Sequence, residues 1–234
     1  MIIGCPVRKR DWILPLWHEH VLRACEVANV KNPEFVFACG TDDEPTLHIV
    51  KQWCDPILVS EPVREDRRDW HTERYMHMAN IRNNLLRRVR QSRQDFFLSL
   101  DSDILLHPDA IKSMLENYKR YKKLGCWAVG GKTFMTTAGR NCPSYGIWKT
   151  SNYDQGIRRS DSSAVMPVGV LMAIKLMAPE AYNVNYDFHH WGEDLGWSAN
   201  VARAGGKMWW DGTVANKHIM EPWMLDRIDK RCNF

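Results

Sequence analysis

Short apolar runs alternate with helical patterns along the first half of the chain. Apolar runs of strand length cover residues 2–5, 35–38, 57–59 and 96–100, and apolar residues at helical spacing cover residues 11–27, 72–89 and 109–123. Strands that alternate with helices build a mostly parallel sheet with helices on both faces. The sequence therefore predicts an α/β fold whose ligands bind in the crevice beyond the carboxyl ends of the strands.

The second half has a different pattern. We expect strands at residues 127–129, 170–174 and 208–210, and a helix over residues 193–204 that ends at Gly205-Gly206. A long polar segment at residues 136–163 is typical of a functional lid or binding loop. The length of 234 residues suits one compact domain, in which the second half builds the other wall of the cleft.

The net charge and the arginine distribution exclude few functions but indicate which ligands the chain could bind. The net charge of +4 suits an anionic ligand such as a nucleotide diphosphate without requiring nucleic acid. Nine arginines crowd one stretch, which we interpret as a solvated helical face. They are Arg64, Arg67, Arg68, Arg74, Arg82, Arg87, Arg88, Arg90 and Arg93.

The seven cysteines include no Cys-x-x-Cys pair, so we expect free thiols. Without a signal peptide or an apolar run of roughly 20 residues, we expect a soluble, cytoplasmic protein.

Asp101-Ser102-Asp103 directly follows the apolar run that ends at Leu100. Two carboxylates on the same side of an extended segment can hold a hard divalent cation that also binds phosphate oxygens. Asp-x-Asp alone is also common in surface turns and at helix caps. The apolar residues on both sides of this triplet favour a buried metal site over a surface turn.

Gly192-Glu193-Asp194 places two acids in the first turn of the expected helix, where the helix dipole favours their charged forms. That dipole effect alone would explain acids at a helix start. The aromatic and histidine-rich lead-in at residues 188–191 indicates a substrate pocket wall as well. A carboxylate beside such a pocket can take the proton from an attacking hydroxyl, as a general base.

Two further segments carry groups suited to a phosphate and a metal. His218 follows the strand expected at residues 208–210 and could complete an octahedral metal site, although one histidine among nine is more often packing or surface. Pro6 to Arg10 offers a turn with cations that can pair with phosphates, and otherwise it is a basic surface loop. The chain lacks a Gly-x-Gly-x-x-Gly after any strand and a P-loop motif.

In combination, these segments resemble the glycosyltransferase-A superfamily, family 2-like enzymes and in places the β-1,4-galactosyltransferases. The order of motifs is Pro-x-Arg-x-Arg, Asp-x-Asp, Trp-Gly-Glu-Asp and a downstream histidine. The matching residues are Pro6, Arg8 and Arg10, then Asp101 and Asp103, then Trp191 to Asp194, then His218. The similarity spans nearly the whole chain, and the order and spacing of these short motifs carry its specificity.

The resemblance implies roles for these residues. Asp101, Asp103 and His218 would hold Mn²⁺ or Mg²⁺, and Asp194, with Glu193 beside it, would deprotonate the acceptor hydroxyl and give inversion. Residues 1–107 would form the nucleotide-binding half and residues 108–234 the acceptor-binding half. UDP is the nucleotide expected by analogy, with GDP as the alternative. Contacts to the nucleotide-sugar donor are expected from Pro6, Arg8, Arg10, Asp42, Asp43, Arg82, Asp101, Ser102, Trp191 and Gly192.

Departures from the family pattern leave the acceptor open. One glycine precedes Glu193 where the galactosyltransferases have two, so acceptor specificity does not transfer. A glycan, a protein or a modified nucleic-acid base could each be the acceptor. Two other classes compete: a two-metal nuclease or phosphodiesterase using the same carboxylates, and a non-catalytic nucleic-acid or carbohydrate binding module using its eleven tryptophans.

Overall fold

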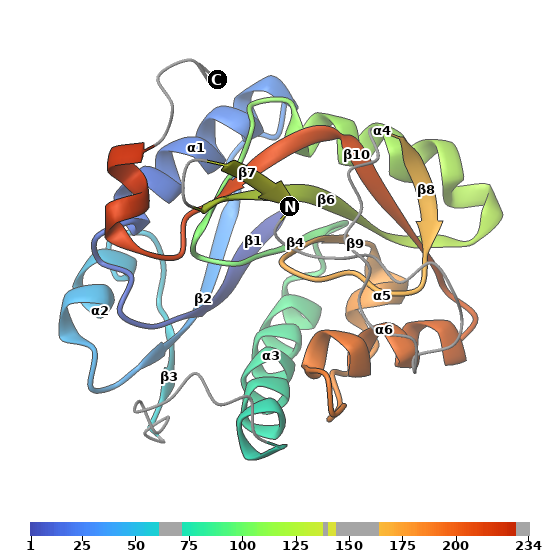
Figure 1. The fold of residues 1–234 in the computed structure, drawn as a ribbon. Coiled ribbons are helices and arrows are strands. Elements are labelled where there is room, and N and C mark those ends of the chain that lie inside the picture. The colour runs from blue at the N-terminus through green and yellow to red at the C-terminus, as the bar shows by residue number, and fades with distance from the viewer. Residues whose placement is uncertain (61–71, 138–139, 144–163, 228–234) are drawn as a thin grey trace.

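The computed structural model describes residues 1–60, 72–137, 140–143 and 164–227 (Figure 1). The helices are α1 (Leu14–Val27), α2 (Glu44–Val50), α3 (Thr72–Ser92), α4 (Ala110–Tyr121), α5 (Pro179–Tyr182) and α6 (Glu193–Arg203), with 3₁₀ turns η1 (Lys122–Leu124) and η3 (Pro222–Arg227). The strands are β1 (Ile2–Val7), β2 (Glu34–Gly40), β3 (Ile57–Val59), β4 (Phe97–Leu100), β5 (Ile104–Leu105), β6 (Cys126–Thr137), β7 (Arg140–Pro143), β8 (Val165–Val168), β9 (Ile174–Met177) and β10 (Lys207–His218).

All ten of these strands join one sheet, whose main path runs β3-β2-β1-β4-β9-β6-β10-β5. Pairing is parallel from β3 to β4 and between β6 and β10. The pairs of β9 with β4 and β6, of β10 with β5 and β8, and of β6 with β7 are antiparallel. The predicted α/β class is therefore confirmed, with the parallel order concentrated in the first half of the chain.

Helices cover both faces of the sheet, as the alternating pattern predicts (Figure 1). One apolar core packs α1, α2 and α4 on one face, and a second packs α3, α5 and α6 on the other. The buried residues of α1 include Leu14, Trp17 and Val21, which recur at helical spacing. The apolar side of each helix thus packs against the sheet, and each face of the sheet has its own core.

Three strands differ from their predicted limits. Pro6 does not end β1, which continues to Val7 because Pro6 lies within the parallel register opposite Ala38. The strand expected at residues 170–174 begins only at Ile174, where it pairs with Leu100. Strand β10 extends to His218, so this histidine is the last residue of a strand rather than part of a loop beyond it.

The arginine-rich stretch is only partly a solvated face. Arg87 and Arg88 are exposed on α3, but Arg82 is buried, so the interpretation is wrong for Arg82. Arg64, Arg67 and Arg68 lie outside the described residues, as does most of the loop expected at 136–163.

Cys5, Cys25, Cys39, Cys54 and Cys126 are free thiols, as expected. Among the described helices, none combines the length and the apolar character that a membrane crossing requires.

Candidate active site

The Asp-x-Asp segment lies at the carboxyl edge of the sheet because β4 ends at Leu100. Three segments that are distant in sequence fix its backbone. The indole N–H of Trp17 donates to the Asp101 carbonyl (3.1 Å), the Asp101 amide donates to Ala173, and the Ile219 amide donates to the Asp103 carbonyl (2.7 Å). The two carboxylates therefore project from a backbone held by α1, the start of β9 and the end of β10.

Asp103 contacts two cationic or titratable partners. Arg10 donates to its Oδ2 (3.1 Å), and Nε2 of His218 lies 3.4 Å from its Oδ1. Burial raises the pKa of Asp103, but the hydrogen bond and charge of His218, together with Arg10, outweigh burial and hold that pKa below its usual value. Asp103 is therefore a carboxylate at neutral pH, as a metal ligand must be.

The loop after β1 is tied to the start of α2. The Asp43 carboxylate accepts hydrogen bonds from the Lys9 amide (2.5 Å) and the Thr46 amide (3.4 Å), which makes Asp43 the N-cap of α2. The Arg10 amide donates to the Thr46 hydroxyl (3.2 Å). Arg8 forms an ion pair with the exposed Asp42. The backbone is thereby fixed where Arg8 and Arg10 present their guanidinium groups.

The second acidic pair begins α6. Gly192 precedes the helix with a φ of 119°, a conformation that L side chains rarely adopt. A β-carbon there would lie 3.5 Å from the Tyr75 ring, an ordinary contact distance, so the backbone conformation rather than the space favours glycine. Glu193 and Asp194 follow directly and are both buried. The predicted helix start is confirmed, and the two carboxylates lie inside the protein rather than on its surface.

Arg82 of α3 connects the two acidic segments. Its guanidinium donates to Asp101 Oδ1 (3.1 Å) and Glu193 Oε1 (3.0 Å), and lies 4.0 Å from Asp194 Oδ1. The side chain of Arg82 is only 7% exposed. One buried cation thus holds the Asp-x-Asp strand end and the α6 start at a fixed separation.

Lys175 of β9 contacts Asp194 from the other side. Its ammonium donates to Asp194 Oδ1 (2.6 Å) and to the Met172 carbonyl (3.0 Å). The Lys175 side chain is completely buried. Sequence reasoning did not identify this residue. The available signal was a single lysine inside the apolar run at residues 170–177.

The three carboxylates around Arg82 and Lys175 titrate differently. Burial raises the pKa of Asp101 and of Glu193, and the charge of Asp194 adds to both effects. Burial acts on Asp194 in the same direction, but Lys175 and Arg82 outweigh it, so the pKa of Asp194 is lowered. Asp194 is therefore the acid of the α6 pair that its surroundings keep ionised.

The predicted metal triad is not assembled as a triad. Within the described residues, no group of three or more His, Cys, Asp and Glu side chains is arranged to hold a metal ion, and Asp101 is paired with Arg82. Asp103 and His218 do lie side by side, and carboxylate oxygen with imidazole nitrogen is a donor set that Mn²⁺ accepts. The chemistry of these two side chains therefore fits a divalent cation.

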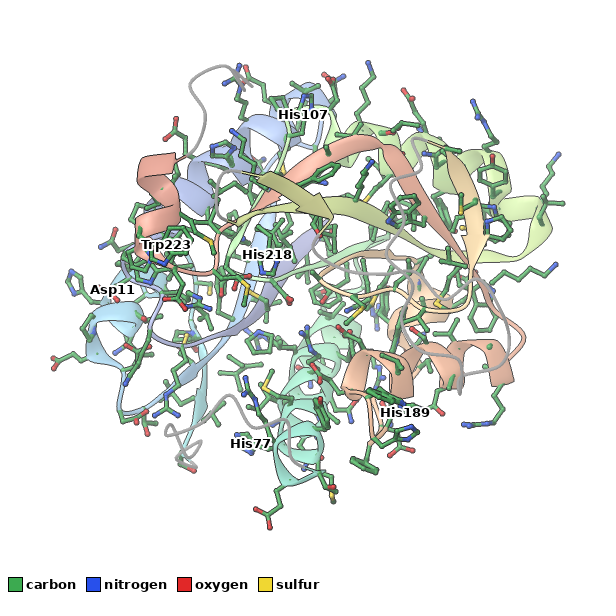
Figure 2. All side chains as sticks on the ribbon, in the orientation of Figure 1. Asp11, His77, His107, His189, His218 and Trp223 are labelled. Carbon is green, nitrogen blue, oxygen red and sulfur yellow. The ribbon has the colours of Figure 1, made fainter. Side chains whose placement is uncertain are left out.

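The remaining predicted residues differ in location. His218 is 3% exposed and lies in the interior, whereas His77, His107 and His189 lie toward the edges of the molecule (Figure 2). Trp191 is 51% exposed, directly before the α6 start, while Ser102 is buried between the two aspartates. The structure thus brings Arg10, Asp101, Asp103, Glu193, Asp194 and His218 to one edge of the sheet, where Arg82 and Lys175 contact Asp101, Glu193 and Asp194.

Comparison with known proteins identifies the fold. No family model and no curated protein matches the chain. Among solved structures, TarS of S. aureus superposes with a TM-score of 0.59 at 12% identity, over 94% of this chain and 37% of TarS. The mannosyltransferase PcManGT of Pyrobaculum calidifontis, in complex with GDP-Man and Mn²⁺, gives a TM-score of 0.57 at 12% identity, over 97% of this chain and 60% of its own.

A third similar structure is that of an enzyme with another name. UDP-glucose pyrophosphorylase, complexed with UDP-glucose, superposes with a TM-score of 0.52 at 9% identity, over 92% of this chain and 91% of its own. One fold commonly serves several reactions, and identities this low establish the fold alone. Together with the sheet order and the Asp-x-Asp at its carboxyl edge, the superpositions show that this chain has the glycosyltransferase-A fold.

Proposed function

We propose that the protein is a metal-dependent glycosyltransferase that moves a sugar from a nucleotide-sugar donor to an acceptor hydroxyl. The observation that carries this proposal is the convergence of two acidic pairs at one edge of the sheet. The guanidinium of Arg82 joins Asp101 of the first pair to Glu193 of the second and lies 4.0 Å from Asp194. Asp103 and its neighbour His218 would supply a metal as Lewis acid, and the buried, ionised Asp194 would supply a general base, which are two functions that such a transfer uses.

The donor side consists of Asp103, His218, Arg8 and Arg10. Asp103 and His218 would hold Mn²⁺ or Mg²⁺, which as a Lewis acid neutralises charge on the leaving diphosphate. Arg8 and Arg10 are partly exposed and are positioned to bind phosphate oxygens, with Arg10 exchanging Asp103 for phosphate. Asp42, which is exposed, would contact the ribose. The solved complexes of similar structures contain GDP-Man with Mn²⁺ and UDP-glucose, which supports a UDP or GDP donor.

The acceptor side centres on Asp194. In the proposed reaction, Asp194 takes the proton of the acceptor hydroxyl while the acceptor oxygen bonds to the anomeric carbon. The bond from that carbon to the diphosphate breaks, and the diphosphate leaves with the electron pair. Attack opposite the leaving group inverts the anomeric configuration. Phe188 and Trp191 are exposed beside the α6 start and offer ring faces to an acceptor glycan, protein or modified base.

Ligand-induced stabilisation tests the donor assignment first. We expect UDP or GDP, or one of their sugar conjugates, to raise the melting temperature in the presence of Mn²⁺, because selective binding stabilises the folded state. Asp103→Asn should remove the metal-dependent part of that shift. An unchanged melting temperature with all these nucleotides would overturn the proposal. It would then favour the nuclease and binding-module alternatives.

Product stereochemistry tests the role of Asp194. Proton NMR of the transferred sugar should show inversion of the anomeric centre. Retention of configuration would remove the general-base role, because a single displacement assisted by one base inverts the centre.

A further inference from the structure

We propose that Lys175 is a positioning residue of the transfer reaction: it holds Asp194 by Oδ1, so that Oδ2 is presented to the acceptor hydroxyl. This inference rests on the proposed function and assigns a task to a residue that the family motifs do not include. Lys175 would not touch the substrate. It would act through the carboxylate that does.

The location of Lys175 is unusual for a lysine. It lies in β9 between Ile174 and Leu176, in register opposite Ser99 of β4, and its side chain has no exposure to solvent. Lysine is almost never fully buried unless it is paired. Ile174 and Leu176 point to the opposite face of the sheet, whereas Lys175 extends into the core on the other face, near the rings of Tyr186 and Trp197. An apolar residue at position 175 would continue that second core, so the sheet itself gives no reason for a charge at this position.

The contacts of the ammonium restrict how Asp194 can turn. Nζ of Lys175 donates to Asp194 Oδ1 at 2.6 Å and to the Met172 carbonyl at 3.0 Å. It also lies 5.7 Å from the ring centroid of Tyr186 and 5.9 Å from that of Trp197, within the range of cation–π attraction. Protein groups thus surround the ammonium on several sides. A lysine fixed in this way is a rigid anchor for the carboxylate.

The two oxygens of Asp194 have different surroundings. Oδ1 accepts from Lys175 and is 4.0 Å from Arg82, whereas among the described residues none donates a hydrogen bond to Oδ2. The Asp194 side chain keeps 10% exposure. One oxygen is therefore committed to the protein, and the other is the one available to a proton from outside.

Energetics favour a functional over a purely structural reason for the pair. Burying two charges costs desolvation that their attraction barely repays, so a buried ion pair is weak support for stability. Burial lowers the pKa of Lys175, but the charge of Asp194 outweighs this and raises it, while Lys175 lowers the pKa of Asp194. Both groups are consequently charged at neutral pH, and Asp194 is ready to accept a proton.

A stability cycle tests the pairing without any activity measurement. Lys175→Met and Asp194→Asn should each lower the melting temperature, because each leaves one buried partner without its counterpart. The melting temperature of the double variant should fall by much less than the sum of the two single losses. Additive losses would show that the two side chains are not coupled, and would overturn the inference.

A kinetic comparison tests the positioning role. Nucleoside diphosphate release from UDP-glucose and from GDP-mannose with Mn²⁺ is measured for the wild type and for Lys175→Met, normalised to folded protein. We expect kcat to fall ~10²-fold, the scale of a misplaced catalytic group, with the donor KM unchanged. An unchanged kcat would overturn the inference, and so would a rise in donor KM as large as the fall in kcat.

Asp211→Asn is the matched control for buried charge. Asp211 is 1% exposed and accepts hydrogen bonds from Asn117 (2.9 Å) and the Thr213 amide (2.9 Å), away from the proposed site. This variant should lose stability while keeping kcat per folded molecule. A wild type that releases no nucleotide from either donor and gains no stability from UDP, GDP or Mn²⁺ would overturn the proposed function itself. Wild-type turnover that Lys175→Met preserves would overturn only the present inference.

Discussion

Two groups of charged residues meet at the carboxyl edge of the sheet, and they are built differently. The donor-side group consists of Asp103, Arg10 and His218, and the base-side group of Glu193, Asp194, Arg82 and Lys175. In the donor-side group the cation is 28% exposed, whereas in the base-side group the two cations are 7% and 0% exposed. The cation of the first group can therefore exchange its partner for solvent or a ligand more readily than the two buried cations of the second group.

This difference matches the two tasks of the proposed reaction. A metal and a diphosphate must bind and leave in each cycle, so their ligands need partners that can be displaced. A base that acts in every cycle gains from a fixed geometry. Burial therefore separates the part of the site that changes its contacts from the part that keeps them.

The largest expected effect is on turnover of Asp194→Asn. The variant retains the shape of the side chain but cannot accept a proton, so kcat should fall ~10²–10⁴-fold. The measurement is nucleotide release per folded molecule, below the melting temperature. Retention of more than about a tenth of wild-type kcat would show that another group takes the proton, and Glu193 would be the next candidate.

Arg82→Met should give the largest loss of stability. Removal of the guanidinium leaves Asp101, Glu193 and Asp194 close together without it, and breaking a buried pair costs about 3–5 kcal/mol of unfolding free energy. Urea denaturation measures the change. Arg87→Met is the control on the same helix, where the side chain is exposed and we expect a change within about 0.5 kcal/mol. Equal losses of stability in the two variants would contradict the conclusion that Arg82 connects the two acidic segments.

Asp103→Asn should act on binding more than on folding. At ligand concentrations about 100-fold above the dissociation constant, binding stabilises a protein by roughly 2.7 kcal/mol, and the metal-dependent share of this should disappear. The exposed Asp55→Asn provides the control. If both variants kept the Mn²⁺-dependent shift, the donor-side group would not be the metal site.

The two acids of the base-side group should respond to pH with opposite signs. The pKa of Asp194 is lowered, so the stability it contributes is present above its unfolded value near 3.8 and is lost as pH falls through the folded value. The pKa of Glu193 is raised, so its contribution is present below about 4.5 and is lost as pH rises through the folded value.

Melting curves from pH 3 to pH 7 check this contrast. Glu193→Gln should gain stability relative to the wild type as pH rises, whereas Asp194→Asn should lose it. A difference of 1 kcal/mol corresponds to roughly 2–4 °C in a chain of this size. Parallel pH profiles for the two variants would show that their environments are alike.

The smallest expected effect is that of Arg10→Gln without ligand. The pair of Arg10 with Asp103 is partly solvated, so its loss should cost at most about 1 kcal/mol and less at high salt. Urea denaturation at low and high salt measures this. A cost close to that of Arg82→Met would show that the donor-side group is as rigid as the base-side group.

Much of the site framework could be predicted from sequence. The apolar run before Asp101 predicted a strand that ends at the ligand-binding edge, and the acids at 193–194 predicted a helix start, because these signals are local in the chain. The end of β1 at Pro6 and the start of β9 at residue 170 were wrong, because strand limits depend on neighbouring strands rather than on the residues themselves.

The sequence by itself determined the strand-helix order, the position of Asp101 and Asp103 at a strand end, and the acidic start of α6. Only the tertiary structure decided which charges meet. Arg82 and Glu193 are 111 positions apart, Arg10 and Asp103 are 93 apart, and the side chain of Lys175 in β9 reaches Asp194 at the start of α6. Periodicity reports which face of an element is buried. The partner of a buried charge is set by the three-dimensional packing that brings distant elements together, because a charge is retained in the interior where opposite charges or hydrogen-bond donors lie within contact distance.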